Sequence, residues 1–335
     1  MTFHAIGDLA QSLSVRRQNA AVQTDIQRLT QELSSGRVAD LSGHLGGSFA
    51  QLADIEGRVA LISAQSKAGA EAAIRTTAMQ TALEHVQSQL GELSGHALLA
   101  DHGGGGPALD AIASEAGRVL ESMIGAFNSR VAGQNIFAGD APGSAPLADA
   151  ATLIGAVRSA VSGASDTAGL KSALDTFFDD PAGGFETLIY RGGQGDAAPH
   201  RLGGGEEVSL SIRADDLRLR NALKQTVAAA ISADDSLALS GAQRVTLMRE
   251  AGAGMARAVD AIVGLRADLG FAEARIDQSI ARNAAESSSL KIARSDLVAA
   301  DPFETAIALE QAQLRLETIY TLTARTQRLN LVNFL

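Results

Sequence analysis

A long apolar row decides the fold class, and it lies in the stretch "MREAGAGMARAVDAIVGLRADLGFAEARIDQSIARNAAESSSLKIARSDL", residues 248–297. Every seventh residue from the first one is apolar, except for a single asparagine. A seven-residue repeat of this length is typical of a helix that supercoils along a partner helix. The row consists of Met248, Met255, Ile262, Leu269, Ile276, Asn283, Leu290 and Leu297. Its seven apolar members predict an intramolecular core.

Two features of this row need interpretation. The companion positions Ala258, Leu265, Ala272 and Ser279 are mixed in size and polarity, which favours a helix bundle over an isolated two-stranded coil. Asn283 allows two interpretations. It either fixes the register of the helix against its partner or faces solvent near a helix end, and the sequence does not decide between them.

The N-terminal part of the chain can supply the partner helices. Apolar residues at steps of three and four predict a first helix over roughly 5–34. Gly36 follows at a position suited to a helix end. A longer helix is expected over about 49–99, and a third over about 109–131 after a glycine-rich break.

The chain closes on another predicted helix, which starts at "DPFE", residues 301–304. Asp301 can cap it, Pro302 suits its first position and Glu304 can bond back to the cap. We expect this helix to span 302–332. Its last residues are apolar, although chain ends are usually polar and frayed.

The middle of the chain has a different character. Five of the six prolines fall between residues 107 and 199, together with several glycine runs. Here we expect strands at 184–193 and 205–216 and short helices near 147–162 and 167–178. The predicted fold is mainly α, an elongated helical bundle or coiled coil formed by the N- and C-terminal arms, with a small α+β insert. The predicted domains are the terminal helices (1–40 and 301–335), a helical bundle (41–140 and 216–300) and an inserted domain with strands (141–215).

Composition excludes several classes of function. The chain has no cysteine, so disulfides and cysteine-based metal sites are excluded. Its formal net charge is −10 and its basic residues are scattered, so no nucleic-acid partner is expected. The sequence shows no cleaved secretory signal and no membrane span. The six histidines form no metal-binding spacing, and adjacent carboxylates such as Asp179 and Asp180 are interpreted as solvated loop charges. We therefore expect no catalytic, cofactor or metal site.

Self-association is the remaining hypothesis, because two terminal helices cannot cover all of their own apolar residues. A head-to-tail interface of this kind builds rings or open tubes. The candidate assembly residues are Ile6, Leu9, Leu13, Ile26, Leu29, Leu33, Leu316, Ile319, Leu322, Leu329, Val332, Phe334 and Leu335.

Both ends of the sequence resemble bacterial flagellins and their relatives. The first end is "LTQELSSGRVAD" (29–40), and the second is "ALEQAQLRLETIYTLTARTQRLNLVNFL" (308–335). Within this superfamily, "NSRVAGQNIFAGDAP" (128–142) is similar to the segment that leads into the middle domain of hook–filament junction proteins, the third class of hook-associated proteins. Ile136 stands where that segment commonly has tyrosine. The stretch "LSGHLGGSFA" (41–50) departs from the pattern of filament flagellins.

This resemblance implies a structural subunit that joins hook to filament by assembling into a ring or tube. Its partners would be itself, flagellin, the first hook-associated protein and a flagellar export chaperone. Its place would be outside the cell, reached by type III export without a cleaved signal. The alternatives are a filament flagellin, a secreted helical adhesin or spacer and, least expected, an enzyme.

Overall fold

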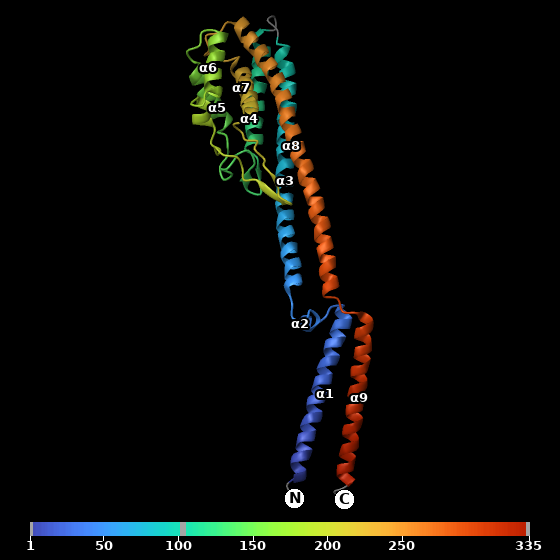
Figure 1. Cartoon of the computed structure of the whole chain (residues 1–335). Helices are drawn as coiled ribbons and strands as arrows, with labels where there is room; N and C mark the ends of the chain where they lie inside the picture. The colour runs from blue at the N-terminus through green and yellow to red at the C-terminus, as the bar shows by residue number, and fades with distance from the viewer. Residues whose placement is uncertain (1–2, 101–104, 333–335) are drawn as a thin grey trace. The chain divides into compact units, whose positions relative to one another are not determined.

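The computed structural model describes residues 3–100 and 105–332, and this part of the chain is mainly helical (Figure 1). The small sheets have two strands each, so the predicted mainly α fold with a small α+β insert is confirmed. The elements in order are α1 (Phe3–Ser35), α2 (Leu41–His44), α3 (Ala50–Leu98), α4 (Gly105–Phe127), β1 (Arg130–Val131), β2 (Gln134–Asn135), α5 (Ala150–Val161), α6 (Thr167–Asp179), the π-helix η1 (Phe185–Ile189), β3 (His200–Gly203), β4 (Glu206–Val208), α7 (Leu217–Ile231), α8 (Gly241–Leu297) and α9 (Pro302–Val332).

The chain divides into two compact units. One consists of Met1–Ile62 and Ala285–Leu335, and the other of Ser63–Ala284. Both boundaries lie inside long helices, α3 and α8, rather than in loops. The finer division into three domains remains a prediction.

In the larger unit, α3 and α8 run antiparallel and pack through the heptad row. Met248, Met255, Ile262 and Ile276 are fully shielded from solvent, and Leu269 nearly so. The two helices approach closely at Gly252, where an added Cβ would lie 2.9 Å from the Cβ of Ala97. Ser94 Oγ donates a hydrogen bond of 2.8 Å to the carbonyl of Gly252 at the same crossing. The last two members of the row, Leu290 and Leu297, lie in the other unit and are half-buried.

Asn283 is buried but does not pair with the facing helix. Its Nδ2 donates to the carbonyl of Leu202 in β3 at 2.8 Å, and Ser279 Oγ donates to the same oxygen at 2.8 Å. The interpretation of Asn283 as a solvent-facing residue is therefore wrong. Its partner is the hairpin of the insert, which the sequence alone did not indicate.

The insert attaches to the bundle through the segment that follows α4. The amide of Asp140 donates to the carbonyl of Gly195 at 3.0 Å, and the amide of Ala214 donates to the carbonyl of Phe137 at 2.9 Å. Gly139 has φ +60°, and an added Cβ there would lie 2.4 Å from the carbonyl oxygen of Gly195. Three distant parts of the chain thus meet at one glycine, which explains why this position needs a residue without a side chain.

One predicted strand of the insert is wrong. The stretch 184–193 is not a strand, because it contains η1 and a single bridge from Tyr190 to Leu147. Phe185 and Ile189 are both buried and four residues apart, which is a helical spacing. The strand that pairs with β4 is instead β3.

The third helix also ends earlier than predicted. α4 stops at Phe127, and the β1–β2 hairpin occupies 130–135. Asn128 follows directly, and its side chain bonds both backbone groups of Leu147, at 3.0 Å and 2.9 Å. The chain after α4 is thereby tied to the segment that leads into α5. The sequence analysis did not place α7, although its buried residues have helical spacing.

In the smaller unit, a short pairing joins the end of α1 to the start of α9. The amide of Val38 donates to the carbonyl of Val298, and that of Ala300 donates to Gly36, both at 3.0 Å. Gly36 has φ +67° and terminates α1, as expected. Asp301 caps α9 as predicted, because its Oδ1 accepts the amides of Phe303 and Glu304.

A buried carboxylate holds this pairing in place. Glu32 is 5% exposed, and its Oε1 accepts the amide of Ala39 at 3.0 Å. Arg28 Nη1 lies 3.1 Å and 3.2 Å from the two carboxylate oxygens of Glu32. Glu32 therefore connects the last turn of α1 to the backbone of the segment that follows it.

We expect Ile262→Asp to destabilise the larger unit by at least about 3 kcal/mol, because it places a charge without a partner in the core. A thermal melt should show a fall of roughly 6 °C or more. Val263→Asp is the matched control, since Val263 is the next residue of α8 and is 48% exposed. An equal fall in both variants would contradict a core position for Ile262.

We expect Glu32→Ala to loosen the pairing of 36–38 with 298–300. It leaves the amide of Ala39 without its acceptor and Arg28 with only Asp25 as a carboxylate partner, a loss of about 1–3 kcal/mol. Hydrogen exchange at these backbone amides should become about five- to a hundredfold faster. Glu310→Ala removes an exposed carboxylate from α9 and should leave these rates unchanged. Unchanged exchange in Glu32→Ala would show that the backbone pairing does not need the carboxylate.

Candidate assembly surface

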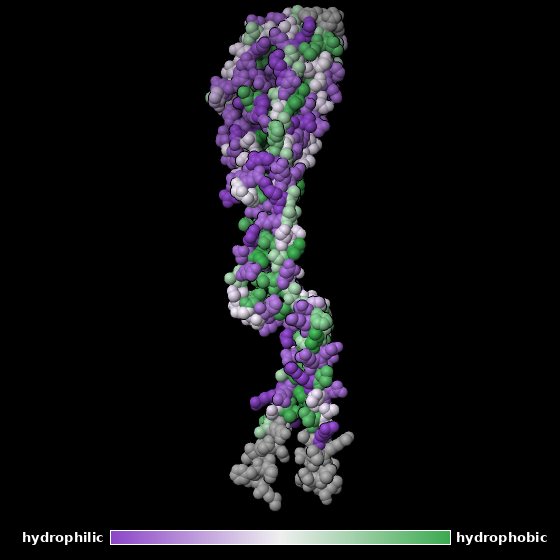
Figure 2. All heavy atoms as spheres, turned by 45° about the vertical axis from the view of Figure 1, so that its right-hand side comes forward, coloured by the Kyte–Doolittle hydropathy of each residue, from purple (hydrophilic) through white to green (hydrophobic). Residues whose placement is uncertain are grey.

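The α1–α9 helix pair leaves large apolar side chains exposed. Leu29 and Ala312 are each 7% exposed and lie between the helices. Phe303, Leu314 and Leu322 of α9 are 74%, 65% and 57% exposed. Figure 2 shows apolar residues at the surface of this pair. Two helices of this composition bury only part of their apolar surface, so the remainder is available to other chains.

A groove runs along the same pair. Its volume is about 560 Å³, and α1 and α9 both contribute to its walls. It is lined by Gln18, Ala21, Val22, Leu314, Arg315, Thr318 and Ile319. Gln23 Nε2 donates to the hydroxyl of Tyr320 across the pair at 3.3 Å. The groove therefore has an apolar floor with polar groups at its margins, a combination that suits a helix from another chain.

The candidate assembly residues are distributed as follows. Leu29 is buried; Ile26, Leu316 and Ile319 are half-buried; Leu13, Leu33 and Leu322 are exposed. The backbones of Ile6, Leu9, Leu329 and Val332 are helical, but their side chains lie outside the described part, as do Phe334 and Leu335 altogether. Whether these residues contact a neighbouring subunit remains a proposal.

The sequence analysis missed three surface residues of this pair. Phe303, Ile307 and Leu314 lie on α9 at helical steps of four and seven, on a different face from Leu316 and Ile319. The signal was present, because apolar residues occur around most of the circumference of α9 rather than on one stripe. A helix with that pattern requires more than one packing partner.

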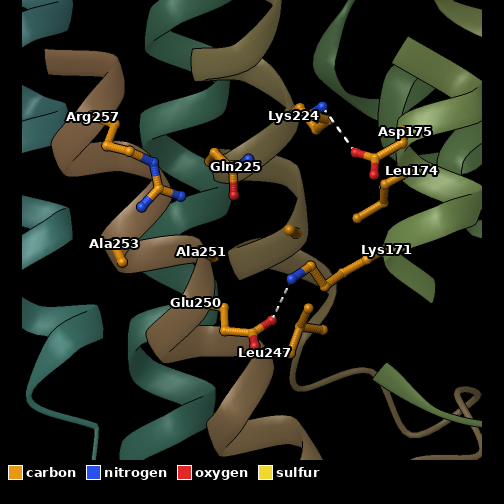
Figure 3. A pocket seen from close by; sticks show the side chains of 11 residues that line it. Lys171, Leu174, Asp175, Lys224, Gln225, Leu247, Glu250, Ala251, Ala253 and Arg257 are labelled. Carbon is orange, nitrogen blue, oxygen red and sulfur yellow. Dashed lines mark hydrogen bonds and ion pairs between the residues drawn. The ribbon is translucent and has the colours of Figure 1, made fainter. Parts of the chain in front are cut away.

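A second cavity lies in the larger unit between α6, α7 and α8 (Figure 3). Its volume is about 220 Å³, and its charged side chains mostly pair with one another. Lys224 Nζ lies 3.0 Å from Asp175 and 2.7 Å from Asp179, and Lys171 lies 3.0 Å from Glu250. Burial acts to lower the pKa of Lys224, but its bonds to Asp179 and Asp175 outweigh this effect and raise it. No serine, histidine or tyrosine lines this cavity, and both of its lysines are paired with carboxylates.

One serine–histidine pair was tested for catalytic geometry. His85 Nε2 lies 2.8 Å from Ser122 Oγ, and His85 is exposed. In the part of the chain that the structure describes, no carboxylate is bonded to His85, so the third group of a triad is missing. Residues 3–100 and 105–332 also contain no group of three metal-ligating side chains. No helix within these ranges is long and apolar enough to cross a membrane.

Comparisons with known proteins give one family match and similar solved structures. Residues 253–335 match the family model of the bacterial flagellin C-terminal helical region. The structure of a putative flagellar hook-associated protein from Vibrio parahaemolyticus is similar, with a TM-score of 0.52 and 14% sequence identity, over 73% of this chain and 95% of that chain.

The crystal structure of Bacillus cereus FlgL is also similar. Its TM-score is 0.49 at 17% identity, over 72% of this chain and 100% of that chain. No curated protein sequence matches the chain. The predicted resemblance to the flagellin superfamily is confirmed for the C-terminal part of the chain: most of α8 and all of α9 match the flagellin C-terminal helical region, and the fold is like that of the Vibrio protein.

Proposed function

We propose that this protein is a structural subunit of the bacterial flagellum that joins the hook to the filament. In this proposal the subunits assemble into a ring or tube and form the platform on which the flagellin filament stands. The function is mechanical and serves motility, with no chemical turnover. The observation that carries the proposal is the α1–α9 pair, in which a flagellin-type C-terminal helix exposes apolar residues on a second face.

The physical argument for assembly rests on the free energy of the exposed side chains. Burying one leucine fully is worth about 1.5–3 kcal/mol. Leu314 and Phe303 are at least 65% exposed, so contact with neighbouring subunits could recover much of this energy. Because every subunit carries the same surface, this free energy would be gained at each contact around a ring. A surface on one subunit that fits a different surface on the next generates a ring or tube.

The junction is favoured over the filament by the segment 128–142. It forms the β1–β2 hairpin and the glycine crossing at which the insert begins, and its sequence resembles the junction proteins. The similar Vibrio protein is described as a putative flagellar hook-associated protein. A filament flagellin is the second candidate, supported by the match of 253–335. A secreted helical adhesin or spacer is a further alternative.

The proposed partners and location follow from this role. A junction subunit would contact the first hook-associated protein on the hook side and flagellin on the filament side. It would be held by a flagellar export chaperone before type III export to the outside of the cell. A chain without cysteine cannot form incorrect disulfides after export.

We expect Leu314→Glu to block assembly while leaving the monomer intact. The substitution places a charge on the exposed floor of the groove, where a neighbour would have to bury it. Gln313→Glu is the matched control, because Gln313 is the preceding residue and is also exposed. Both variants are expressed in a strain that lacks the native gene. With Leu314→Glu, cells should release flagellin into the medium and should not swim. With Gln313→Glu, flagellin should stay in the filament and cells should swim.

Two outcomes would contradict that expectation. A lower melting temperature of the Leu314→Glu monomer would place Leu314 in an internal core. Normal filaments with a normal melting temperature would show that this face of α9 carries no assembly contact.

Position in the flagellum separates the two main candidates. We expect antibodies against the insert to label a short band between hook and filament in electron micrographs. Labelling along the whole filament would instead identify a filament flagellin. Labelling away from flagella would favour the adhesin alternative.

A further inference from the structure

The β3–β4 hairpin lies against α3 and α8 (Figure 1), and a small set of polar contacts joins it to α8. Its turn consists of Gly203, Gly204 and Gly205, all with positive φ, so the hairpin reverses direction sharply. Leu202 is fully buried beneath it, and its carbonyl accepts the side chains of Ser279 and Asn283. These two bonds do not depend on pH. Two further groups of the hairpin, Glu206 and His200, can gain or lose a proton.

An acidic residue on β4 lies between two arginines of α8. Arg275 Nε is 3.1 Å from Glu206 Oε1, and Arg282 Nη2 contacts the other carboxylate oxygen. Arg275 Nη2 also donates to the backbone carbonyl of Glu207 at 3.1 Å. Hydrogen bonds from Arg282 and Arg275 lower the pKa of Glu206 below its ordinary value of 4.5. This contact requires the ionised carboxylate.

A histidine on β3 interacts electrostatically with an arginine of α3. His200 Nε2 and Arg75 Nε are both shielded from solvent, and neither has a hydrogen-bond partner among the described residues. Arg75 uses its Nη2 to donate to the carbonyl of Ile136 at 3.2 Å, so the guanidinium is held in place. A protonated His200 would put a second positive charge beside a fixed one, with little water to screen it.

The charged groups that act on His200 come from α3. Burial and the charge of Arg75 lower the pKa of His200 below its ordinary value of 6.5, and the charge of Glu71 acts in the opposite direction with a smaller effect. Glu71 is exposed, which reduces its influence. The docked hairpin therefore favours the neutral imidazole.

We propose that the β3–β4 hairpin is an acid-released latch on the α3–α8 pair, held closed by neutral His200 beside Arg75 and by ionised Glu206 between Arg275 and Arg282. Both groups bind fewer protons when the hairpin is docked than when it is free. Docking is therefore strongest above about pH 6.5 and weakens as the pH falls. As the pH falls, His200 takes up its proton first and weakens docking below pH 6.5. Glu206 takes up its proton second and weakens docking below about pH 4.5.

Release of the latch would change the surface of the bundle without unfolding it. Leu202 would leave its buried position, and the side chains of Ser279 and Asn283 would lose their shared acceptor. The α4–α7 core of the insert contains neither titrating group and would stay folded. The proposal does not depend on the flagellar role, because it concerns contacts inside one chain.

Hydrogen exchange in the full-length chain tests the latch. Protection of the amides in 200–208, corrected for the intrinsic pH dependence of exchange, should fall between pH 7.5 and 5.0. The fall should be at most tenfold per pH unit while one proton is taken up. Amides of α4 and α7 should keep their protection throughout. A flat profile for 200–208 would overturn the proposal.

Two variants separate the contributions. His200→Gln should remove the change between pH 6.5 and 5.0, whereas His96→Gln should keep it, because His96 is an exposed residue bonded to Glu115. Glu206→Gln should reduce protection already at pH 7.5 and keep the step below pH 6.5. An unchanged slope in His200→Gln would overturn the role of His200.

A direct titration of the unmodified chain gives a result even if a variant fails to fold. The ring protons of His200 in the unmodified chain should titrate, by NMR, with a midpoint below 6.5. A midpoint at or above 6.5 would mean that the docked hairpin does not disfavour the charged imidazole, and the latch would be excluded.

Discussion

Close packing of α8 on α3 is the constraint on which the rest of the larger unit depends. The heptad row supplies the apolar contacts, and Gly252 lets the helices approach so closely that no side chain fits between them. Ser94 bonds to the backbone at this point and so fixes the register as well as the distance. The insert is then built on a rigid surface, because Ser279 and Asn283 of the same helix hold the carbonyl of Leu202. Helix α8 thus packs one face into the core and binds the hairpin through the polar residues Ser279 and Asn283.

The helical arms could be predicted from the sequence because their signals are periodic and local. The row from Met248 to Ile276, the cap at Asp301 and the helix end at Gly36 are each visible within a few turns of sequence. The insert could be predicted less well. Phe185 and Ile189 belong to a run that is short, apolar and bounded by glycine, and such a run fits a strand and a single helical turn equally. Just after the end of α4, Asn128 binds Leu147 across 19 residues, a contact that no local pattern reveals.

The assembly surface shows a similar division. The apolar character of α9 was apparent from the sequence, but the face that remains exposed was not. Exposure depends on how α1 rotates against α9, which the pairing of Val38 with Val298 and the carboxylate of Glu32 help to set. Phe303 and Leu314 were therefore missed, although they are among the most exposed apolar residues of the described chain. Periodicity identifies a helix that needs partners, and only the packing of its first partner shows where the second must bind.

The two ways of using polar groups in this chain fit the proposed role of a subunit that is first a monomer and later part of an assembly. In the smaller unit, a buried carboxylate and a backbone pairing fix the joint between α1 and α9, so the exposed apolar faces are presented in a defined orientation. Preorganisation of this kind reduces the entropy lost on binding, and more of the energy of burying Leu314 or Phe303 then remains for assembly. In the larger unit, two groups that can change their charge hold the hairpin on a bundle whose core needs neither of them. A rigid joint at the assembly surface and a releasable contact on the bundle can therefore coexist, because the two sets of contacts share no residue.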